Sequence, residues 1–220
     1  TVAAGITPSG VVHIGNFREV MSVDLVARAL RDQGVEVRFI YSWDDFDVFR
    51  KVPQGIPEAD MLEENLRRSV ADVPDPYAQH DSYASHFIAL FEESLAPLGI
   101  DPEFIRQSGR YRQGAYAQGI RKALERRGEI REILNAHRSQ PLGEDWLPLA
   151  GFCASCGRDE IEFSWPGDWL VDYRCRTCDH EASVDLREGG SVKLPWRVDW
   201  PMRWQHEGVA FEPGGKDHSS

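Results

Sequence analysis

The chain contains 220 residues, 41% of them hydrophobic, which is enough for one large domain or two small ones with a buried core. Its 36 acidic residues outnumber the 25 basic ones and give a formal net charge of −11. This balance argues against a general nucleic-acid coat protein, because such binding depends on Lys and Arg that neutralise phosphates, but a local basic patch could still dock one RNA end. The sequence has no apolar run of about 18 residues and no secretory leader, so we expect no membrane partner and a cytoplasmic location.

The first element is an apolar run at residues 2–6, which predicts a short buried strand followed by a turn rich in Pro, Ser and Gly. A helix is expected over residues 13–33, with Gly34 as its C-terminal stop. Strand, glycine-bearing turn and helix N-terminus together aim backbone N–H groups at a ligand above the turn, which favours phosphate. His13 and Asn16 add side-chain donors there. An ordinary helix N-terminus in an α/β protein gives the same short pattern, so the rest of the chain has to decide.

The same helix carries an acidic residue in an unusual place. Glu19 falls near the centre of an apolar stripe at helical spacing. A carboxylate on a packed face is costly unless a cation meets it. Glu19 therefore predicts either a buried salt bridge with an arginine from elsewhere or a pocket above the sheet in which it receives a substrate cation. The stripe consists of Val20, Val23, Val26, Ala27 and Leu30.

The next segments alternate between strand and helix patterns. Strands are predicted at residues 35–41 and 103–107, and helices at residues 58–69, 77–98 and 112–137. This β-α-β-α-β-α order implies an α/β fold with a parallel, doubly wound sheet. Three acidic residues follow the second strand and suit helix capping as well as a functional site, namely Asp44, Asp45 and Asp47.

The helix predicted at residues 112–137 is locally basic, since it offers only Glu125, Glu129 and Glu132 against a larger number of cations. Most runs of this kind are solvated helix faces. The alternative is a ridge that contacts the phosphates of an RNA end. The cations, including one just after the helix, are Arg121, Lys122, Arg126, Arg127, Arg131 and Arg138.

All four cysteines lie in one segment, as two Cys-x2-Cys pairs separated by 18 residues. This spacing can bring four thiolates to one tetrahedral zinc ion at about 2.3 Å. Gly157 follows the first pair as a small turn residue, Asp179 follows the second as a polar neighbour, and Trp165, Trp169 and Tyr173 could build a small ribbon between the pairs. Two disulfides are the competing use, and a cytosolic chain argues against them. Four protein ligands close the site, so we predict a structural Zn²⁺ bound by Cys153, Cys156, Cys175 and Cys178.

Two further blocks follow the cysteines. The first holds three tryptophans and two arginines in nine residues, and for Trp200 and Trp204 a core or interface position is the simplest interpretation. The second, residues 208–218, reads as another strand with a glycine-rich turn, where Asp217 could accept from ribose hydroxyls and His218 offers a polar contact. We predict three regions, with a catalytic first half, a connective insertion holding the zinc site and a return to the catalytic domain: 1–110, 111–190 and 191–220.

Four blocks of the chain resemble the class I lysyl-tRNA synthetase family. They are T-P-S-G-x-x-H-I-G-N-F-R-E from Thr7, W-D-D-x-D-x-x-R-K-V-P from Trp43, W-R-V-D-W-P-M-R-W from Trp196 and F-E-P-x-G-K-D-H from Phe211. The first has H-I-G-N where class I synthetases have H-I-G-H. The resemblance spans essentially the whole chain, in order. It implies a Rossmann-like catalytic domain with a zinc-ribbon-like insertion, which activates L-lysine with ATP and Mg²⁺ and transfers it to the acceptor end of tRNA(Lys).

The resemblance also implies roles for individual residues. His13 and Asn16 would be catalytic and would act on the ATP phosphates. Glu19 would receive the lysine ammonium, which agrees with its unusual place on the helix. The implied ATP contacts are Pro8, Ser9, Gly10, His13, Gly15, Asn16, Gly215 and Asp217, and the implied lysine contacts are Gly5, Thr7, Glu19, Trp196 and His218.

The chain departs from the family pattern because it has no K-M-S-K-S motif, whose lysine stabilises the departing pyrophosphate, and no anticodon-reading helical domain. We interpret it as a fragment truncated before the second ATP motif. Losing such a donor costs on the order of 10²–10³ in rate, so we expect the fragment to activate lysine poorly. The alternatives are a class I synthetase for glutamate, cysteine or arginine, a small-molecule nucleotidyltransferase, and a non-catalytic paralogue that binds RNA or an amino acid.

Overall fold

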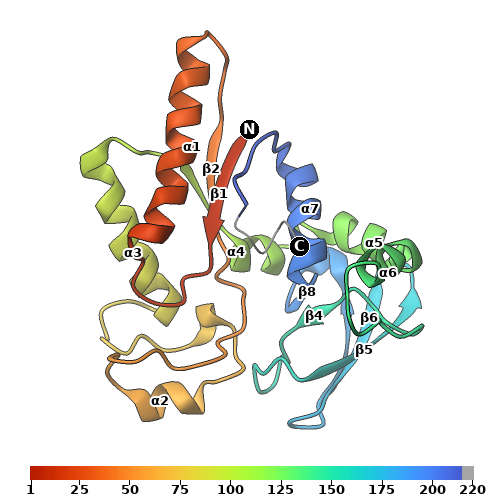
Figure 1. Cartoon of the computed structure of the whole chain (residues 1–220). Helices are drawn as coiled ribbons and strands as arrows, with labels where there is room; N and C mark the ends of the chain where they lie inside the picture. The colour runs from red at the N-terminus through yellow and green to blue at the C-terminus, as the bar shows by residue number, and fades with distance from the viewer. Residues whose placement is uncertain (215–220) are drawn as a thin grey trace. The chain divides into compact units, whose positions relative to one another are not determined.

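The computed structural model describes residues 1–214 (Figure 1). Contacts divide the chain into two compact units. The first unit is Thr1–Ser108 with Gly208–Pro213, and the second contains Gly109–Glu207. The chain therefore rejoins its first unit at Gly208, whereas the predicted return began at residue 191.

The first unit is built on a parallel sheet of three strands in the order β1-β2-β3. In β1 and β2, Val2 pairs with Phe39 and Ile6 pairs with Trp43. The returning segment extends the sheet beside β1, where the N–H of Ala3 donates to the carbonyl of Phe211 at 2.8 Å. The predicted parallel α/β arrangement is confirmed. The strands are β1 (Val2–Ile6), β2 (Phe39–Trp43) and β3 (Glu103–Arg106).

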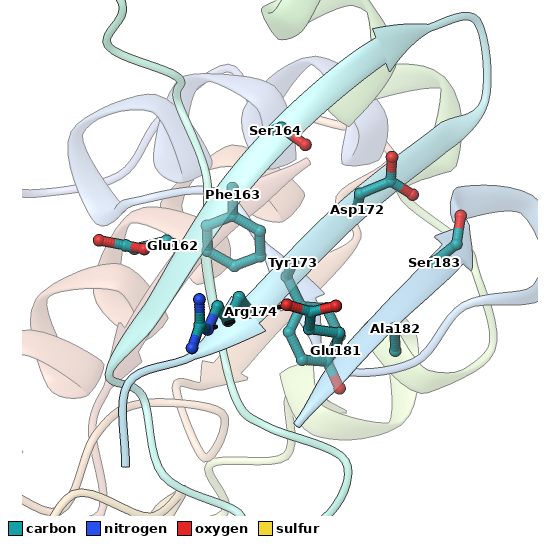
Figure 2. A pocket seen from close by; sticks show the side chains of 9 residues that line it. All are labelled: Glu162, Phe163, Ser164, Asp172, Tyr173, Arg174, Glu181, Ala182 and Ser183. Atoms are coloured by element: carbon teal, nitrogen blue, oxygen red, sulfur yellow. Dashed lines mark ion pairs between the residues drawn. The ribbon is translucent and has the colours of Figure 1, made fainter. Parts of the chain in front are cut away.

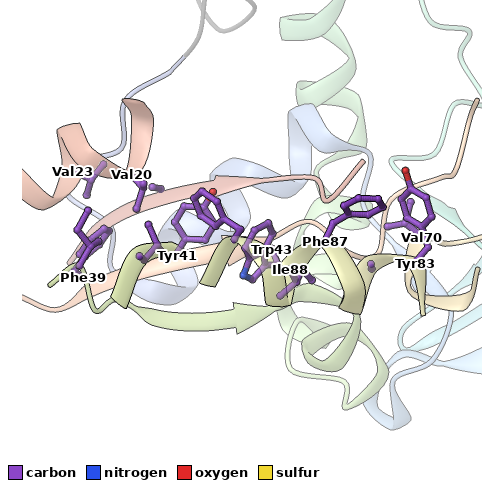
Figure 3. Packing of buried hydrophobic residues seen from close by; sticks show 14 of the residues in the cluster. Val20, Val23, Phe39, Tyr41, Trp43, Val70, Tyr83, Phe87 and Ile88 are labelled. Atoms are coloured by element: carbon purple, nitrogen blue, oxygen red, sulfur yellow. The ribbon is translucent and has the colours of Figure 1, made fainter. Parts of the chain in front are cut away.

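The core of this unit lies between the sheet and its two long helices, α1 (Ile14–Asp32) and α3 (Tyr83–Leu95). Side chains alternate across a strand, so Tyr41 and Trp43 point to the face that both helices cover (Figure 3). On the opposite face, a small cluster of Ala3, Ile40 and Ile105 packs against Val209. In the described residues, both connecting helices thus pack on one face. The helices contribute Val20, Val23, Ala27, Phe87 and Phe91.

The first helix begins and ends as predicted, whereas later boundaries shift. The helix predicted at residues 58–69 is only α2 (Ala59–Glu64) with a separate turn η1 (Val70–Asp72), and Arg67 between them has a left-handed φ of 74°. The helix predicted from residue 77 starts at Tyr83. The reason is Asp75, whose carboxylate accepts from the backbone N–H groups of Tyr77, Gln79 and His80 and so stabilises a loop. The turn η2 (Ala96–Leu98) ends this segment.

The single helix predicted at residues 112–137 is wrong. Helix α4 (Gln107–Arg112) ends where that helix was expected to start, and two short helices follow, α5 (Ala117–Glu125) and α6 (Arg127–Asn135). The first break falls at Gly114, where φ is +71° and a Cβ would lie 2.6 Å from the carbonyl oxygen of Arg187. A side chain at this position would prevent that close approach, so glycine interrupts the helix.

The rest of the second unit holds the predicted ribbon and a helix that was not predicted. Three antiparallel strands form the ribbon, and a two-stranded pair joins its ends. The tryptophan-rich block becomes helix α7 (Trp196–Glu207). No helix within residues 1–214 has the length and apolar composition needed to span a membrane. The remaining elements are β4 (Ala150–Gly151), β5 (Ile161–Gly167), β6 (Leu170–Cys175), β7 (Glu181–Asp185), η3 (Leu186–Glu188) and β8 (Val192–Lys193).

Candidate functional site

The turn between β1 and α1 presents its donors outward. His13 is the N-cap of α1, and its Nδ1 accepts from the N–H of Gly15 at 3.1 Å. Because Nδ1 is an acceptor, the ring proton of a neutral His13 resides on Nε2, which can donate to a ligand. A Cβ at Gly15 would lie 2.9 Å from the His13 ring, so the glycine permits this cap. Asn16 follows in the first turn of α1.

Glu19 lies at the other side of this turn, against β1. Its Oε1 accepts from the N–H of Gly5 at 3.2 Å. Burial raises the pKa of Glu19 to about 7, the Gly5 N–H opposes that shift, and the carboxylates of Glu212 and Asp44 add to it. In the part of the chain that the structure describes, no cation pairs with Glu19, so the buried salt bridge finds no partner there. The arrangement leaves a partly buried carboxyl that a bound cation would stabilise.

Glycine at position 5 has a steric role in this arrangement. A Cβ there would lie 2.6 Å from the carbonyl oxygen of Ser42 on the neighbouring strand β2. Any side chain would push β1 and β2 apart at the edge of the site. Gly5 therefore has two roles: its N–H donates to Glu19, and its lack of a side chain lets β1 and β2 pair closely.

Two acidic residues after β2, Asp45 and Asp47, form hydrogen bonds with different parts of the chain. Asp45 is buried, and its two oxygens accept from the N–H and the hydroxyl of Ser108 at 2.8 and 2.5 Å. Burial raises the pKa of Asp45, and the Ser108 donors oppose that shift. Since Ser108 lies in the first turn of α4, Asp45 caps a helix remote in sequence. Asp47 instead accepts from the hydroxyl of Thr7 at 2.9 Å.

Two contributors to this site were not among the predicted site residues. The hydroxyl of Tyr83, from α3, donates to the carbonyl of Ser9 at 2.8 Å, and Glu212 from the returning segment raises the pKa of Glu19. Nothing local marks Tyr83, because it lies 74 residues from Ser9. Glu212 lies within the block F-E-P-x-G-K-D-H, which was the available signal for it.

The structure brings together the predicted residues of the first unit, which lie on β1, the following turn and the start of α1. Trp196 lies in the second unit at the start of α7, 44% exposed, with the guanidinium of Arg197 4.8 Å from its ring centroid. Gly215, Asp217 and His218 lie outside the described residues, so their predicted contacts stay predictions. The first-unit set is Gly5, Thr7, Pro8, Ser9, Gly10, His13, Gly15, Asn16 and Glu19.

The four cysteines form a second candidate site. Their sulfur atoms lie within 4.8 Å of one another, with Cys153 to Cys178 at 3.7 Å and Cys156 to Cys175 at 3.6 Å. A disulfide would need about 2.05 Å. Sulfurs at the corners of a tetrahedron around a zinc ion are about 3.8 Å apart, given Zn–S bonds of about 2.3 Å. The cluster is therefore shaped to hold a metal ion with four thiolates.

The two cysteine turns repeat the same backbone geometry. In the first, the N–H of Gly157 donates to the carbonyl of Cys153 at 2.8 Å, and in the second, the N–H of Asp179 donates to the carbonyl of Cys175 at 3.0 Å. Gly157 and Asp179 have left-handed φ values of 75° and 55°. Tyr173 on β6 accepts from the N–H of Ala154 at 2.9 Å and so joins the first turn to the ribbon.

A shallow pocket of about 690 Å³ lies on the ribbon sheet (Figure 2). Its charged side chains pair with one another across the strands, as Arg174 does with Glu181 at 3.8 Å. No residue of the predicted site lines it, so we place the functional site elsewhere. The lining residues are Glu162, Phe163, Ser164, Asp172, Tyr173, Arg174, Glu181, Ala182 and Ser183.

The basic run of the second unit is largely paired within the unit. Arg121 contacts Glu125 at 2.9 Å and lies 4.5 Å from the ring of Trp169, and Arg126 pairs with Glu129. Paired and stacked arginines suit a solvated helix face better than a ridge reserved for phosphates. The structure thus favours the simpler of the two interpretations.

Comparison with known proteins agrees with the sequence blocks. The family model described as "tRNA synthetases class I (K)" matches residues 1–220. The lysine–tRNA ligases of Borreliella burgdorferi and Pyrococcus furiosus are each 52% identical to the chain, over 100% and 99% of its length. Lysine–tRNA ligase 1 of Methanosarcina acetivorans is 43% identical over the whole chain.

The chain spans about 42% of the length of these relatives (42% for the first two and 41% for the third). The matched part includes the turn with His13 and the four cysteines, because the family model extends over every residue. One conclusion follows from these matches, from the strand, turn and capped helix of the first unit and from the cysteine cluster of the second. The chain belongs to the class I (K) family of tRNA synthetases.

Proposed function

We propose that the chain is part of an enzyme that activates L-lysine with ATP and transfers it to the acceptor end of tRNA(Lys), in the cytoplasm. The observation that carries this proposal is Glu19, a partly buried carboxyl without a cationic partner in residues 1–214, beside a turn whose donors face outward. The relatives' names support lysine as the amino acid.

The chemistry needs positioning more than a reactive side chain. The lysine carboxylate attacks the α-phosphorus of ATP in line, pyrophosphate leaves, and lysyl-adenylate forms; a ribose hydroxyl of the tRNA end then attacks the adenylate carbonyl, and AMP leaves. Nε2 of His13, the amide of Asn16 and the N–H groups of the turn donate to phosphate oxygens as charge develops on them. The magnesium that accompanies ATP offsets charge on the phosphates.

Specificity for lysine follows from the pairing of charges. A site that holds a partly buried carboxylate rejects an amino acid without the matching ammonium, because the carboxylate is then left unpaired. Gly5, Thr7 and Glu19 form the described part of the lysine pocket in this proposal. The resemblance to the family further implies lysine contacts for Trp196 and His218 and adenosine contacts for Gly215 and Asp217.

The cysteine cluster fits Zn²⁺ in a structural role. Four thiolates leave no coordination position for a substrate, so the ion would stabilise the two turns and the ribbon without entering the reaction. The sulfur spacings of 3.6 and 3.7 Å support this assignment.

The experiment that tests the function compares ligand binding by the chain and its Glu19→Gln variant. We expect calorimetry at pH 8 to show that Glu19→Gln weakens L-lysine binding by at least about 30-fold, since a charged hydrogen-bonded partner contributes roughly 2 kcal/mol or more. ATP binding should change by less than about twofold. Equal losses for lysine and ATP would contradict the role given to Glu19.

A second measurement tests the amino acid itself. We expect the wild-type chain to bind lysine and to reject glutamate, cysteine and arginine by at least tenfold, the amount that about 1.4 kcal/mol represents. Pyrophosphate exchange by this chain should be slow, because it has no K-M-S-K-S lysine. Preference for another amino acid would contradict the assignment of lysine. Exchange rates like those of a whole synthetase would contradict the expected slow activation.

A further inference from the structure

We propose that Asp47 and Tyr83 are positioning residues that hold the two ends of the turn at residues 7–9, Asp47 for the lysine side and Tyr83 for the ATP side. The inference rests on the proposed function. Its observations are two hydrogen bonds from outside the strand-turn-helix motif, Thr7 to Asp47 at 2.9 Å and Tyr83 to Ser9 at 2.8 Å.

The first bond decides what the Thr7 hydroxyl can offer a ligand. A carboxylate oxygen only accepts, so the hydroxyl proton of Thr7 is committed to Asp47. Toward a ligand, Oγ1 of Thr7 can therefore only accept a hydrogen bond. An ammonium carries three donors and no acceptor, so Thr7 held in this way suits a cation and disfavours a side chain that must itself accept. Asp47 thereby contributes to selectivity through Thr7.

The second bond decides where a backbone donor points. In a planar trans peptide the carbonyl and the following N–H point in opposite directions. The hydroxyl of Tyr83 draws the carbonyl of Ser9 toward α3, so the N–H of Gly10 is turned away from α3. That N–H is one of the donors that a phosphate at this turn would use.

The packing around Tyr83 holds its side chain in place. Its side chain is fully buried, with its ring centroid 5.0 Å from that of Phe49 and 4.8 Å from that of Phe87. Its own N–H donates to the carbonyl of Val73 at 2.8 Å, and Ser82 caps the helix that it starts. Because the Tyr83 side chain is fixed in this way, its hydroxyl holds the Ser9 carbonyl at a set position relative to α3.

The test measures equilibrium binding of L-lysine and of ATP to the chain and its variants, with folding checked by circular dichroism. We expect Asp47→Asn to weaken lysine binding by about tenfold and ATP binding by less than twofold, because an amide can donate to Thr7 and reverse the bond. Tyr83→Phe removes only the hydroxyl, so we expect ATP binding to weaken by about fivefold to tenfold and lysine binding to stay within twofold.

A double-mutant cycle separates a positioning role from a direct one. In the Thr7→Val background, Asp47→Asn should cause no further loss of lysine affinity, since Asp47 acts through the Thr7 hydroxyl. If Asp47→Asn does not fold, Thr7→Val and Thr7→Ser decide instead. Lysine binding should weaken about tenfold with Val and stay within twofold with Ser, and ATP binding should change with neither.

Several results would overturn the inference. They are equal losses for both ligands in either Asp47→Asn or Tyr83→Phe, additive losses in the Thr7 and Asp47 cycle, and unchanged lysine binding by Thr7→Val. A wild-type chain that binds neither lysine nor ATP would instead refute the proposed function. The two failures are therefore distinguishable.

Discussion

The turn after β1 and the cysteine cluster are built from similar backbone turns, but the groups that they present differ in direction. Both use tight turns in which a backbone N–H meets a nearby acceptor, as Gly15 does with His13 and Gly157 does with the carbonyl of Cys153. The first turn leaves the Nε2 of His13 and the carboxyl of Glu19 for a ligand. The second directs four sulfurs at one point, within 4.8 Å of one another.

Under the proposed function, this difference separates a site that binds and releases ligands from one that stabilises a fold. At the first site, the raised pKa of Glu19 means that the empty pocket holds an ionised carboxylate only at a cost in stability. At the second, the binding energy of a metal held by the four thiolates would be folding energy, because the unfolded chain has no preformed site. Perturbing the two sites should therefore change different observables.

The largest effect should follow loss of the cysteine site. We expect Cys175→Ala, or removal of metal by a strong chelator, to lower the free energy of unfolding of the ribbon by several kcal/mol, on the order of 4 or more. Hydrogen exchange of β5, β6 and β7 is the measurement, together with metal content by atomic absorption.

A matched control lies in the same turn. Thr177→Val removes the hydroxyl bond to Glu160 but leaves the sulfurs unchanged, so protection of the ribbon should change little. If a metal-free sample keeps the hydrogen-exchange protection of the wild type, the cluster does not stabilise the ribbon in the way proposed.

The next effect concerns pH at the first site. A bound ammonium needs ionised Glu19, whose pKa in the free chain is about 7. Lysine affinity should therefore fall about tenfold per pH unit below pH 7 and level off above it. Calorimetry in buffers of different ionisation enthalpy should also show proton release on binding near pH 6. The Glu19→Gln variant should show neither effect.

Stability should respond to pH in the opposite sense. The usual pKa of Glu19 is 4.5, so between pH 4.5 and 7 the folded chain retains a proton that the unfolded chain has released. The free energy of unfolding should therefore fall as pH rises through this window. Glu19→Gln should lack that contribution, which denaturant titration at pH 5 and pH 8 would reveal. Identical pH slopes for wild type and variant would argue against the burial of Glu19.

A smaller effect distinguishes the two tasks of His13. Asparagine is a good N-cap, so His13→Asn should keep the free energy of unfolding within about 0.5 kcal/mol while weakening ATP binding by about tenfold, since the Nε2 donor is lost. His13→Ala should lose the cap as well and destabilise the chain by about 1 kcal/mol. If His13→Asn binds ATP as tightly as the wild type, His13 has only a structural role.

The smallest effect is expected on the basic face of the second unit. Arg126 is already paired with Glu129, so Arg126→Gln should change tRNA binding by less than about twofold, measured by fluorescence anisotropy at two salt concentrations. Glu129→Gln is the control that frees Arg126. A loss of tenfold or more in the first variant, with a smaller salt slope, would instead identify a phosphate contact.

Much of the first site could be predicted because its signals are local. The start of α1 near His13, its extent and the unusual position of Glu19 on its apolar face all follow from spacing within one helix. The single helix at residues 112–137 could not be excluded in this way, since the close approach of Arg187 to Gly114 joins segments far apart in the chain.

The sequence by itself determined the order of strands and helices in the first unit, the start of α1 near His13 and the two Cys-x2-Cys turns, because each depends on a local pattern of residues. Only the tertiary structure decided which partners those residues meet. Asp47 reaches Thr7 across 40 residues and Tyr83 reaches Ser9 across 74. Such contacts depend on strand register and on how helices cross the sheet, which no local pattern encodes.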